Sequence, residues 1–197
     1  MVNWNTVTEF ENKIAQFFGA TYAVAVDSCT HGLELCLRYK GVDTIYSPKH
    51  TYLSVPMLAN KMGLKLVWKP EVWQKFYRVH TGIIDAATLW ERNSYLPGQF
   101  MCLSFQYQKH LSLGRGGMVF CPDEPSYNQL KKMSYDGRLP GIPWREQDIK
   151  EFGFHYYMTP ETAQKGLTIL DEAIRREPRI WGNNDYPDLT KMKLWAK

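Results

Sequence analysis

The sequence predicts an α/β domain in which helices sandwich a mainly parallel sheet. Short apolar runs alternate along the chain with segments whose apolar residues recur at helical spacing, which is the pattern of strand–helix–strand units. The length of 197 residues, with 44% hydrophobic and 14% aromatic content, is enough to bury one large core. We therefore expect residues 1–177 to form this domain and residues 178–197 to form a short irregular tail.

Each element follows from its local pattern. The helices are expected at residues 8–18, 32–39, 54–62, 124–133 and 159–176, the first ending at Gly19 and the last capped by Thr159. The strands are expected at residues 22–26, 44–46, 64–68, 83–85, 100–105 and 118–120. Residues 69–82 show no clear periodicity, and residues 135–153 form an excursion interrupted by Pro and Gly.

The composition excludes several functional classes. The net charge is +4 and the Lys and Arg residues are scattered, so we expect no nucleic-acid partner. No apolar stretch approaches the roughly 20 residues of a membrane span, and the polar residues 1–5 do not resemble a signal peptide. The four cysteines form no CxxC pair. We therefore expect reduced thiols, no metal site, no membrane contact and a cytoplasmic protein.

Polar side chains follow three of the predicted strands at the point where each strand ends. These sites are Ser28-Cys29-Thr30, Asp85, and Ser104 with Lys109. Open α/β sheets bind ligands at the carboxyl ends of their strands, and the loop 28–30 offers amides and hydroxyls to a phosphate at a helix N-terminus. Taken singly, the same residues also fit an ordinary helix cap, a salt bridge and a surface lysine.

One longer run distinguishes between these interpretations. Residues 104–120 read Ser-Phe-Gln-Tyr-Gln-Lys-His-Leu-Ser-Leu-Gly-Arg-Gly-Gly-Met-Val-Phe. This run resembles the Schiff-base segment of the DegT/DnrJ family of sugar aminotransferases, which has Ser-Phe, three residues, Lys, and then Gly-x-Gly-Gly before a strand. Further similar segments, in the family's order, are residues 7–20, Ser28-Cys29-Thr30, Thr51-Tyr52, Asp85-Ala-Ala and residues 153–158, so the resemblance covers about residues 6–170.

The resemblance implies the large domain of fold type I PLP-dependent transferases, with pyridoxal 5'-phosphate bound as a Schiff base on Lys109. It implies that Asp85 keeps the pyridine nitrogen protonated and that Tyr52 stacks on the ring. The residues implied to contact the cofactor are Ser28, Cys29, Thr30, Tyr52, Asp85, Thr88, Ser104, Lys109 and His155. The implied reaction moves an amino group from glutamate or glutamine to a nucleotide-linked keto-sugar, and the implied assembly is a homodimer.

The chain also departs from the family pattern. Cys29 stands in place of a glycine, Thr88 of a glutamine, His155 of an asparagine and Tyr157 of an arginine. A short connection precedes Asp85 where the family has a further helix and strand, and the family's C-terminal domain is mostly missing. The resemblance therefore implies a shortened member of the family. It implies that the cofactor site is retained, but it does not indicate how the substrate is recognised.

Two other functions are compatible with the sequence. A shortened site admits other substrates, so a PLP enzyme of different reaction type is one alternative; it would form product without the pyridoxamine form of the cofactor. A non-catalytic dimeric relic of the family is the other. The retained pair of Asp85 and Lys109 disfavours the relic, and an absence of cofactor binding would establish it.

Overall fold

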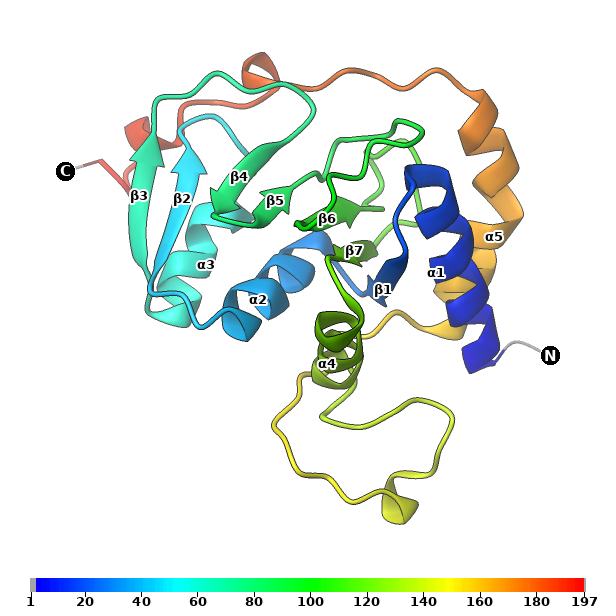
Figure 1. Ribbon diagram of the computed structural model, residues 1–197. Helices are drawn as coiled ribbons and strands as arrows, with labels where there is room; N and C mark the ends of the chain where they lie inside the picture. Colours follow the sequence, from blue (N-terminus) through cyan, green and yellow to red (C-terminus); the bar gives the residue numbers. More distant parts are fainter. Residues whose placement is uncertain (1–2, 197) are drawn as a thin grey trace.

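The computed structural model describes residues 3–196 and contains a five-stranded sheet with helices on both faces (Figure 1). The predicted domain begins at residue 1 and the predicted tail ends at residue 197, and both of these residues lie outside the described part. The helices are α1 (Trp4–Phe18), α2 (Cys29–Tyr39), α3 (Ser54–Met62), α4 (Glu124–Ser134) and α5 (Pro160–Arg175), with short 3₁₀ turns η1 (Trp144–Glu146), η2 (Asn183–Asp185) and η3 (Leu189–Lys191). The strands are β1 (Tyr22–Val26), β2 (Thr44–Pro48), β3 (Lys65–Lys69), β4 (Tyr77–His80), β5 (Ile83–Asp85), β6 (Phe100–Ser104) and β7 (Gly117–Cys121).

Alternate side chains of the central strands enter two separate cores, because successive residues of a strand point to opposite faces. On β7, Met118 and Phe120 pack with α1 and α5, whereas Val119 and Cys121 pack with α2 and α4. The four cysteines are free and buried. The two cores confirm the prediction of an α/β domain whose sheet is sandwiched by helices.

The direction of the sheet corrects the prediction of mainly parallel strands. The strand order is β1-β7-β6-β5-β4, and β5 and β6 form its one parallel pair. A separate two-stranded parallel sheet holds β2 and β3. The prediction was wrong because two pairs of neighbouring strands are joined by turns or loops that reverse the chain: Gly82, with φ of +79°, turns β4 directly into β5, and a loop joins β6 to β7. Such short connections pair strands antiparallel.

The predicted helices and strands are otherwise found within a few residues of their expected bounds. The exception is β4, which lies in the stretch 69–82 where no element was expected. Its side chains alternate between buried and more exposed positions, but aromatic and basic residues hide this alternation in the sequence. No helix among residues 3–196 is long and apolar enough to cross a membrane.

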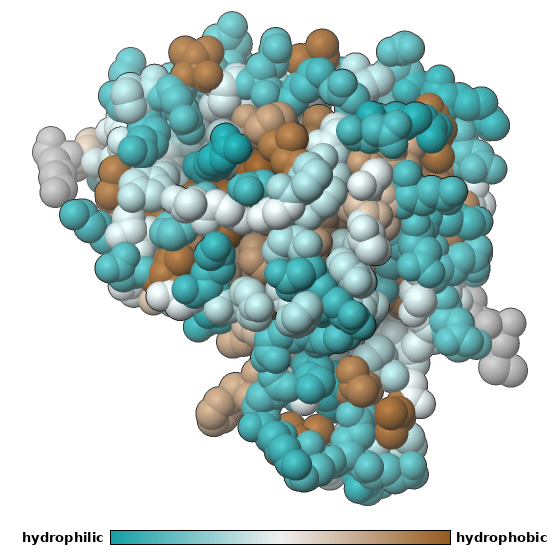
Figure 2. All heavy atoms as spheres, in the orientation of Figure 1, coloured by the Kyte–Doolittle hydropathy of each residue, from teal (hydrophilic) through white to brown (hydrophobic). Residues whose placement is uncertain are grey.

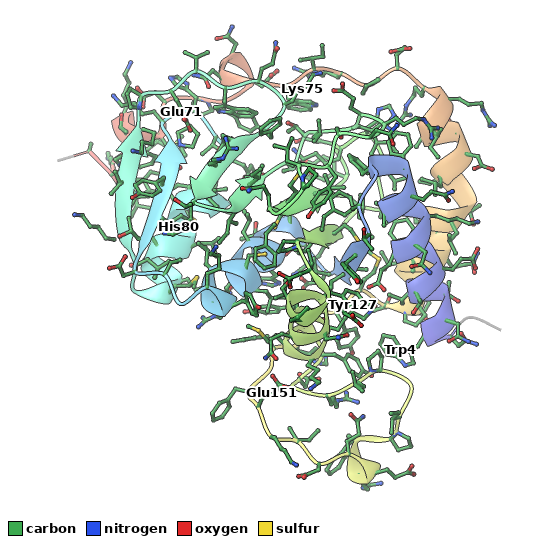
Figure 3. The ribbon with its side chains drawn as sticks, in the orientation of Figure 1. Trp4, Glu71, Lys75, His80, Tyr127 and Glu151 are labelled. Carbon is green, nitrogen blue, oxygen red and sulfur yellow. The ribbon has the colours of Figure 1, made fainter. Side chains whose placement is uncertain are left out.

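The C-terminal tail crosses the molecule from the end of α5 to the edge of β3 (Figure 1). Its backbone is bonded to two earlier segments: the Lys75 amide donates to the Trp181 carbonyl over 2.8 Å, and the Leu189 amide donates to the Lys49 carbonyl over 2.9 Å. Figure 3 places Glu71 and Lys75 at the edge over which the tail runs. Leu189 is buried, so the tail, which contains η2 and η3, is packed onto the domain.

Candidate functional site

A cavity of about 680 Å³ opens where β5 and β6 end, a volume typical of small-molecule sites. Eight of the nine residues predicted to form the cofactor site line it together: Ser28, Cys29, Thr30, Tyr52, Asp85, Thr88, Ser104 and Lys109. The exception is His155, whose largely exposed side chain lies 3.1 Å from Asp136. Within one chain, the structure therefore does not bring His155 to the cavity.

Asp85 ends β5 and is 5% exposed. Its Oδ1 accepts from the Ala87 amide at 2.9 Å, and its Oδ2 accepts from the Tyr77 hydroxyl at 2.5 Å. Burial raises the pKa of the Asp85 carboxyl, although the Tyr77 and Ala87 hydrogen bonds and the nearby Lys109 charge act in the opposite direction. Asp85 is thus a buried carboxyl group that faces a ligand cavity and needs a cationic partner to remain ionised at low cost.

Lys109 lies in the loop after β6, where its amide donates to the Gln106 carbonyl over 2.8 Å. Gly114 and Gly116 have positive φ angles and turn the chain back into β7, which holds the loop against the end of the sheet. The Lys109 Nζ atom is 5.0 Å from the centre of the Trp181 ring. Burial lowers the pKa of Lys109, and the Asp85 charge partly opposes this. A larger fraction of this amine is therefore neutral and nucleophilic than in an exposed lysine.

The first turn of α2 forms the third part of the site. Ser28 caps the helix by accepting from the His31 amide at 3.2 Å, which leaves the Cys29 and Thr30 amides at a position where helices bind anions. Arg115 lines the same cavity and pairs with Asp27 at 2.7 Å. A phosphate group would therefore meet backbone amides, hydroxyls and a guanidinium here.

Gly117 allows β7 to run close beneath this turn. A Cβ atom on Gly117 would lie only 2.5 Å from the Cys29 nitrogen, so no larger residue fits without a shift. Cys29 itself is the first residue of α2, and its Sγ atom points inward, 3.4 Å from the Cys102 carbonyl. The replacement of the family's glycine therefore requires no left-handed backbone.

The remaining predicted residues occupy the rim and floor of the cavity. Tyr52 is 55% exposed and lines the cavity, so its side chain is accessible to a ligand. The Thr88 hydroxyl donates to the Lys75 carbonyl over 2.8 Å, and the Ser104 hydroxyl accepts from the Gln106 amide at 3.3 Å. Both oxygens retain capacity to accept a further hydrogen bond.

Sequence reasoning missed two groups of residues that line this cavity. One comes from the stretch around β4 and consists of Trp73 and Tyr77; the other comes from the tail and consists of Arg179, Trp181, Asp185 and Tyr186. Arg179 pairs with Asp185 and lies 4.1 Å from the centre of the Trp181 ring. The available signal was the density of aromatic residues at 73–77 and 181–186, which is unusual for solvated segments. Among residues 3–196, no cluster of His, Cys, Asp and Glu has the makings of a metal site.

The chain is 25% identical over 178 residues to the spore coat polysaccharide biosynthesis protein SpsC of Bacillus subtilis (strain 168). The matched region covers 88% of this chain and 44% of SpsC. The fold of this chain is similar to that of AtS13 from Actinomadura melliaura, with a TM-score of 0.74. The sequence identity is 22%, and the match covers 85% of this chain and 60% of AtS13.

A similar fold is also found in Spr1654 from Streptococcus pneumoniae, described as a sugar aminotransferase and solved in a PLP form; the TM-score is 0.70, with 18% identity over 85% of this chain and 59% of Spr1654. The chain thus spans less than two thirds of the length of each of these proteins. The family model described as the DegT/DnrJ/EryC1/StrS aminotransferase family matches residues 1–73 and 91–179. The chain therefore belongs to the DegT/DnrJ/EryC1/StrS aminotransferase family.

Proposed function

We propose that this protein binds pyridoxal 5'-phosphate through a covalent bond to Lys109 and transfers an amino group from glutamate or glutamine to a nucleotide-linked keto-sugar. One observation carries the proposal: Lys109, Asp85 and the first turn of α2 line the same cavity. Membership of an aminotransferase family supports the reaction class. SpsC, named for polysaccharide biosynthesis, and Spr1654, solved in PLP and PMP forms, support the choice of sugar and cofactor.

The residues of the cavity fit this cofactor. The Cys29 and Thr30 amides, with Ser28, Ser104 and Arg115, offer donors to the phosphate, while Asp85 offers a buried carboxylate to the ring nitrogen. Tyr52 offers an open aromatic face to the ring, and Thr88 lies on the cavity wall. When bound, the cofactor supplies an electron sink for the carbon that gains or loses the amino group.

The chain's own residues supply the remaining functions. The Lys109 amine is nucleophilic because burial favours its neutral form, and its Nζ can hold the proton that leaves the donor's α-carbon. Asp85 stabilises positive charge at the ring nitrogen. Trp181 and Tyr186, from the tail, line the cavity, and the Trp181 ring lies beside the Lys109 amine. We propose that these tail residues contact the substrate.

We further propose that two copies of the chain form a homodimer in the cytoplasm. Large apolar side chains are exposed on the segment 136–153, which projects beyond α4 (Figure 1) and shows hydrophobic patches on its surface (Figure 2). They are Leu139, Ile142, Trp144, Ile149 and Phe152. His155, which follows this segment in the chain, is also exposed. The free cysteines are consistent with a reducing compartment.

The experiment that tests the reaction is a single half-reaction with a stoichiometric amount of enzyme. Cofactor-loaded protein is mixed with L-glutamate or L-glutamine, and both the visible absorbance and the keto acid are measured. We expect the absorbance of the lysine-bound cofactor to disappear while one equivalent of keto acid forms. The Lys109→Ala variant is the control and should give neither change under the same conditions. Unchanged absorbance in protein that carries the cofactor on Lys109 would reject transamination.

A further inference from the structure

Tyr77 reaches the candidate site from a strand on which no functional residue was predicted. Tyr77 of β4 and Asp85 of β5 are directly paired across the hairpin, and side chains of paired residues lie on the same face of a sheet. The Tyr77 hydroxyl lies 2.5 Å from Asp85 Oδ2. Both residues fall within 74–90, which the family model does not match. The contact is made across the short hairpin of β4 and β5.

Thr51 extends the contact into a chain of three groups. The Thr51 hydroxyl lies 2.5 Å from the Tyr77 hydroxyl, and Thr51, Tyr77 and Asp85 are at most 6% exposed. An ionised carboxylate only accepts hydrogen bonds, so Tyr77 donates to Asp85 and Thr51 donates to Tyr77. Hydrogen bonds in such a chain strengthen one another in a water-poor interior. Burial and the Asp85 charge raise the pKa of Tyr77, which keeps its hydroxyl protonated as a donor.

The other groups around Asp85 leave room for a ligand. Ala87 donates its amide to Oδ1 at 2.9 Å, and the Cys29 Sγ atom lies at a long 3.9 Å from the same oxygen. Lys109 acts on Asp85 only through its charge, which lowers the pKa of Asp85. The Asp85 charge in turn contributes to the raised pKa of Tyr186 and of Cys102. A carboxylate offers about four lone-pair positions, so a ring nitrogen can still bond to Asp85 while Tyr77 and Ala87 remain in place.

We propose that Tyr77, supported by Thr51, is a positioning residue that keeps Asp85 ionised and oriented toward the ring nitrogen of the cofactor. This inference rests on the proposed function for the identity of the group that Asp85 meets. Its physical basis is that burial favours the neutral carboxylic acid, which would take the proton from the ring and weaken the electron sink. A donor fixed on Oδ2 stabilises the ionised form and counteracts that effect.

The first test uses protein without cofactor, so it does not depend on the proposed function. Aspartate labelled with ¹³C at the carboxyl carbon reports the ionisation of Asp85 by NMR, with Asp85→Asn identifying the signal. We expect Tyr77→Phe to raise the titration midpoint of Asp85 by about one pH unit, the size of one hydrogen bond to a charged group. Thr51→Val should shift it in the same direction by less, because Tyr77 still donates.

The second test uses cofactor labelled with ¹⁵N at the ring nitrogen. We expect a protonated ring nitrogen in the native protein and a signal displaced toward the unprotonated position in Tyr77→Phe. Tyr127→Phe is the matched control, since Tyr127 lies on α4 away from the cavity (Figure 3) and should leave both signals unchanged.

An Asp85 midpoint in folded Tyr77→Phe that equals that of the native protein would overturn the inference, as would a larger shift in Thr51→Val than in Tyr77→Phe. A native protein that fails to bind the cofactor would instead reject the proposed function. The ¹³C titration would still decide whether Tyr77 keeps Asp85 ionised.

Discussion

At the scale of single residues, the proposed chemistry depends on the protonation state of the Lys109 amine. Lys109 is a loop residue whose pKa is lowered from 10.5 by burial, while Asp85 acts in the opposite direction. Only the neutral amine attacks an aldehyde, so the rate of covalent loading with pyridoxal phosphate should reach half its maximum at a pH below 10.5. Stopped-flow absorbance over a pH series measures this midpoint. A midpoint at or above 10.5 would show that Lys109 is not in the buried environment described here.

The residue-scale prediction of the site depended on a few positions in one run. The resemblance of the run from Ser104 to the following glycines to the family's Schiff-base segment led to the prediction of Lys109, and Gly114 and Gly116 have the positive φ angles that the turn after it requires. Tyr77 was not predicted, because its role depends on pairing with Asp85 across a hairpin. Because no strand was expected at residues 69–82, this pairing could not be predicted.

At the scale of elements, a buried carboxylate joins three segments. Glu34 of α2 is fully buried and pairs with Arg38 at 2.8 Å and with Lys61 of α3 at 2.7 Å. Its carboxylate also accepts from the Tyr156 hydroxyl at 3.3 Å. Burial alone would raise the pKa of Glu34, but the hydrogen bonds and charges of Lys61 and Arg38 outweigh it and hold the pKa below 4.5.

Glu34→Gln should therefore lower the free energy of unfolding by about 1–3 kcal/mol near neutral pH. A carboxyl pKa that is lower in the folded state contributes stability above 4.5, and this contribution is lost as the pH falls through the folded value. The difference between the native protein and the variant should thus shrink below pH 4.5. Urea unfolding of the native protein and of Glu34→Gln, near neutral pH and below pH 4.5, measures this difference in the free energy of unfolding.

The exposed pair of Glu9 and Lys13 provides the control for Glu34, and Glu9→Gln should change stability by less than about 1 kcal/mol. Equal losses in the two variants would contradict the interpretation of Glu34. So would a Glu34 effect that does not depend on pH.

The tail is the element whose role the sequence concealed. Irregular segments give no periodic signal, so the packing of residues 179–189 became evident only from their contacts with residues 49–50 and 73–75. β4 was missed for a similar reason. The parallel direction was wrongly predicted because helix–strand alternation does not reveal which connections are tight turns. The sandwich of helices around a sheet, in contrast, followed from the apolar patterns, although the sheet divides the single core that was expected into two.

Removing one tail side chain should separate substrate binding from cofactor binding. Trp181→Ala should still bind the cofactor on Lys109, but it should weaken the apparent affinity for the amino donor by about tenfold, the effect of losing roughly 1.4 kcal/mol of contact. Trp195→Ala is the matched control, because Trp195 packs on Trp68, and neither lines the cavity. Donor titrations of the half-reaction compare the variants. Equal affinities for the donor would show that the tail is only a structural element.

At the scale of the whole molecule, the proposed homodimer depends on the projecting segment 136–153. Phe152 is 96% exposed and Trp144 is 59% exposed, and large apolar side chains on a projecting segment are characteristic of interfaces. Sedimentation velocity over a concentration series should show a dimer. Phe152→Asp combined with Trp144→Asp should shift the protein toward monomer while the chain remains folded. A native protein that remains monomeric while binding the cofactor tightly would contradict the dimer.

The central claim is that Lys109 carries pyridoxal phosphate, and one measurement tests it most directly. Protein incubated with the cofactor is reduced with borohydride, digested, and analysed by peptide mass. The structure predicts one stoichiometric adduct on Lys109 and none there in the Lys109→Ala variant. An adduct distributed over exposed lysines such as Lys150, or no adduct, would contradict the claim and would make the non-catalytic relic the better description of this chain.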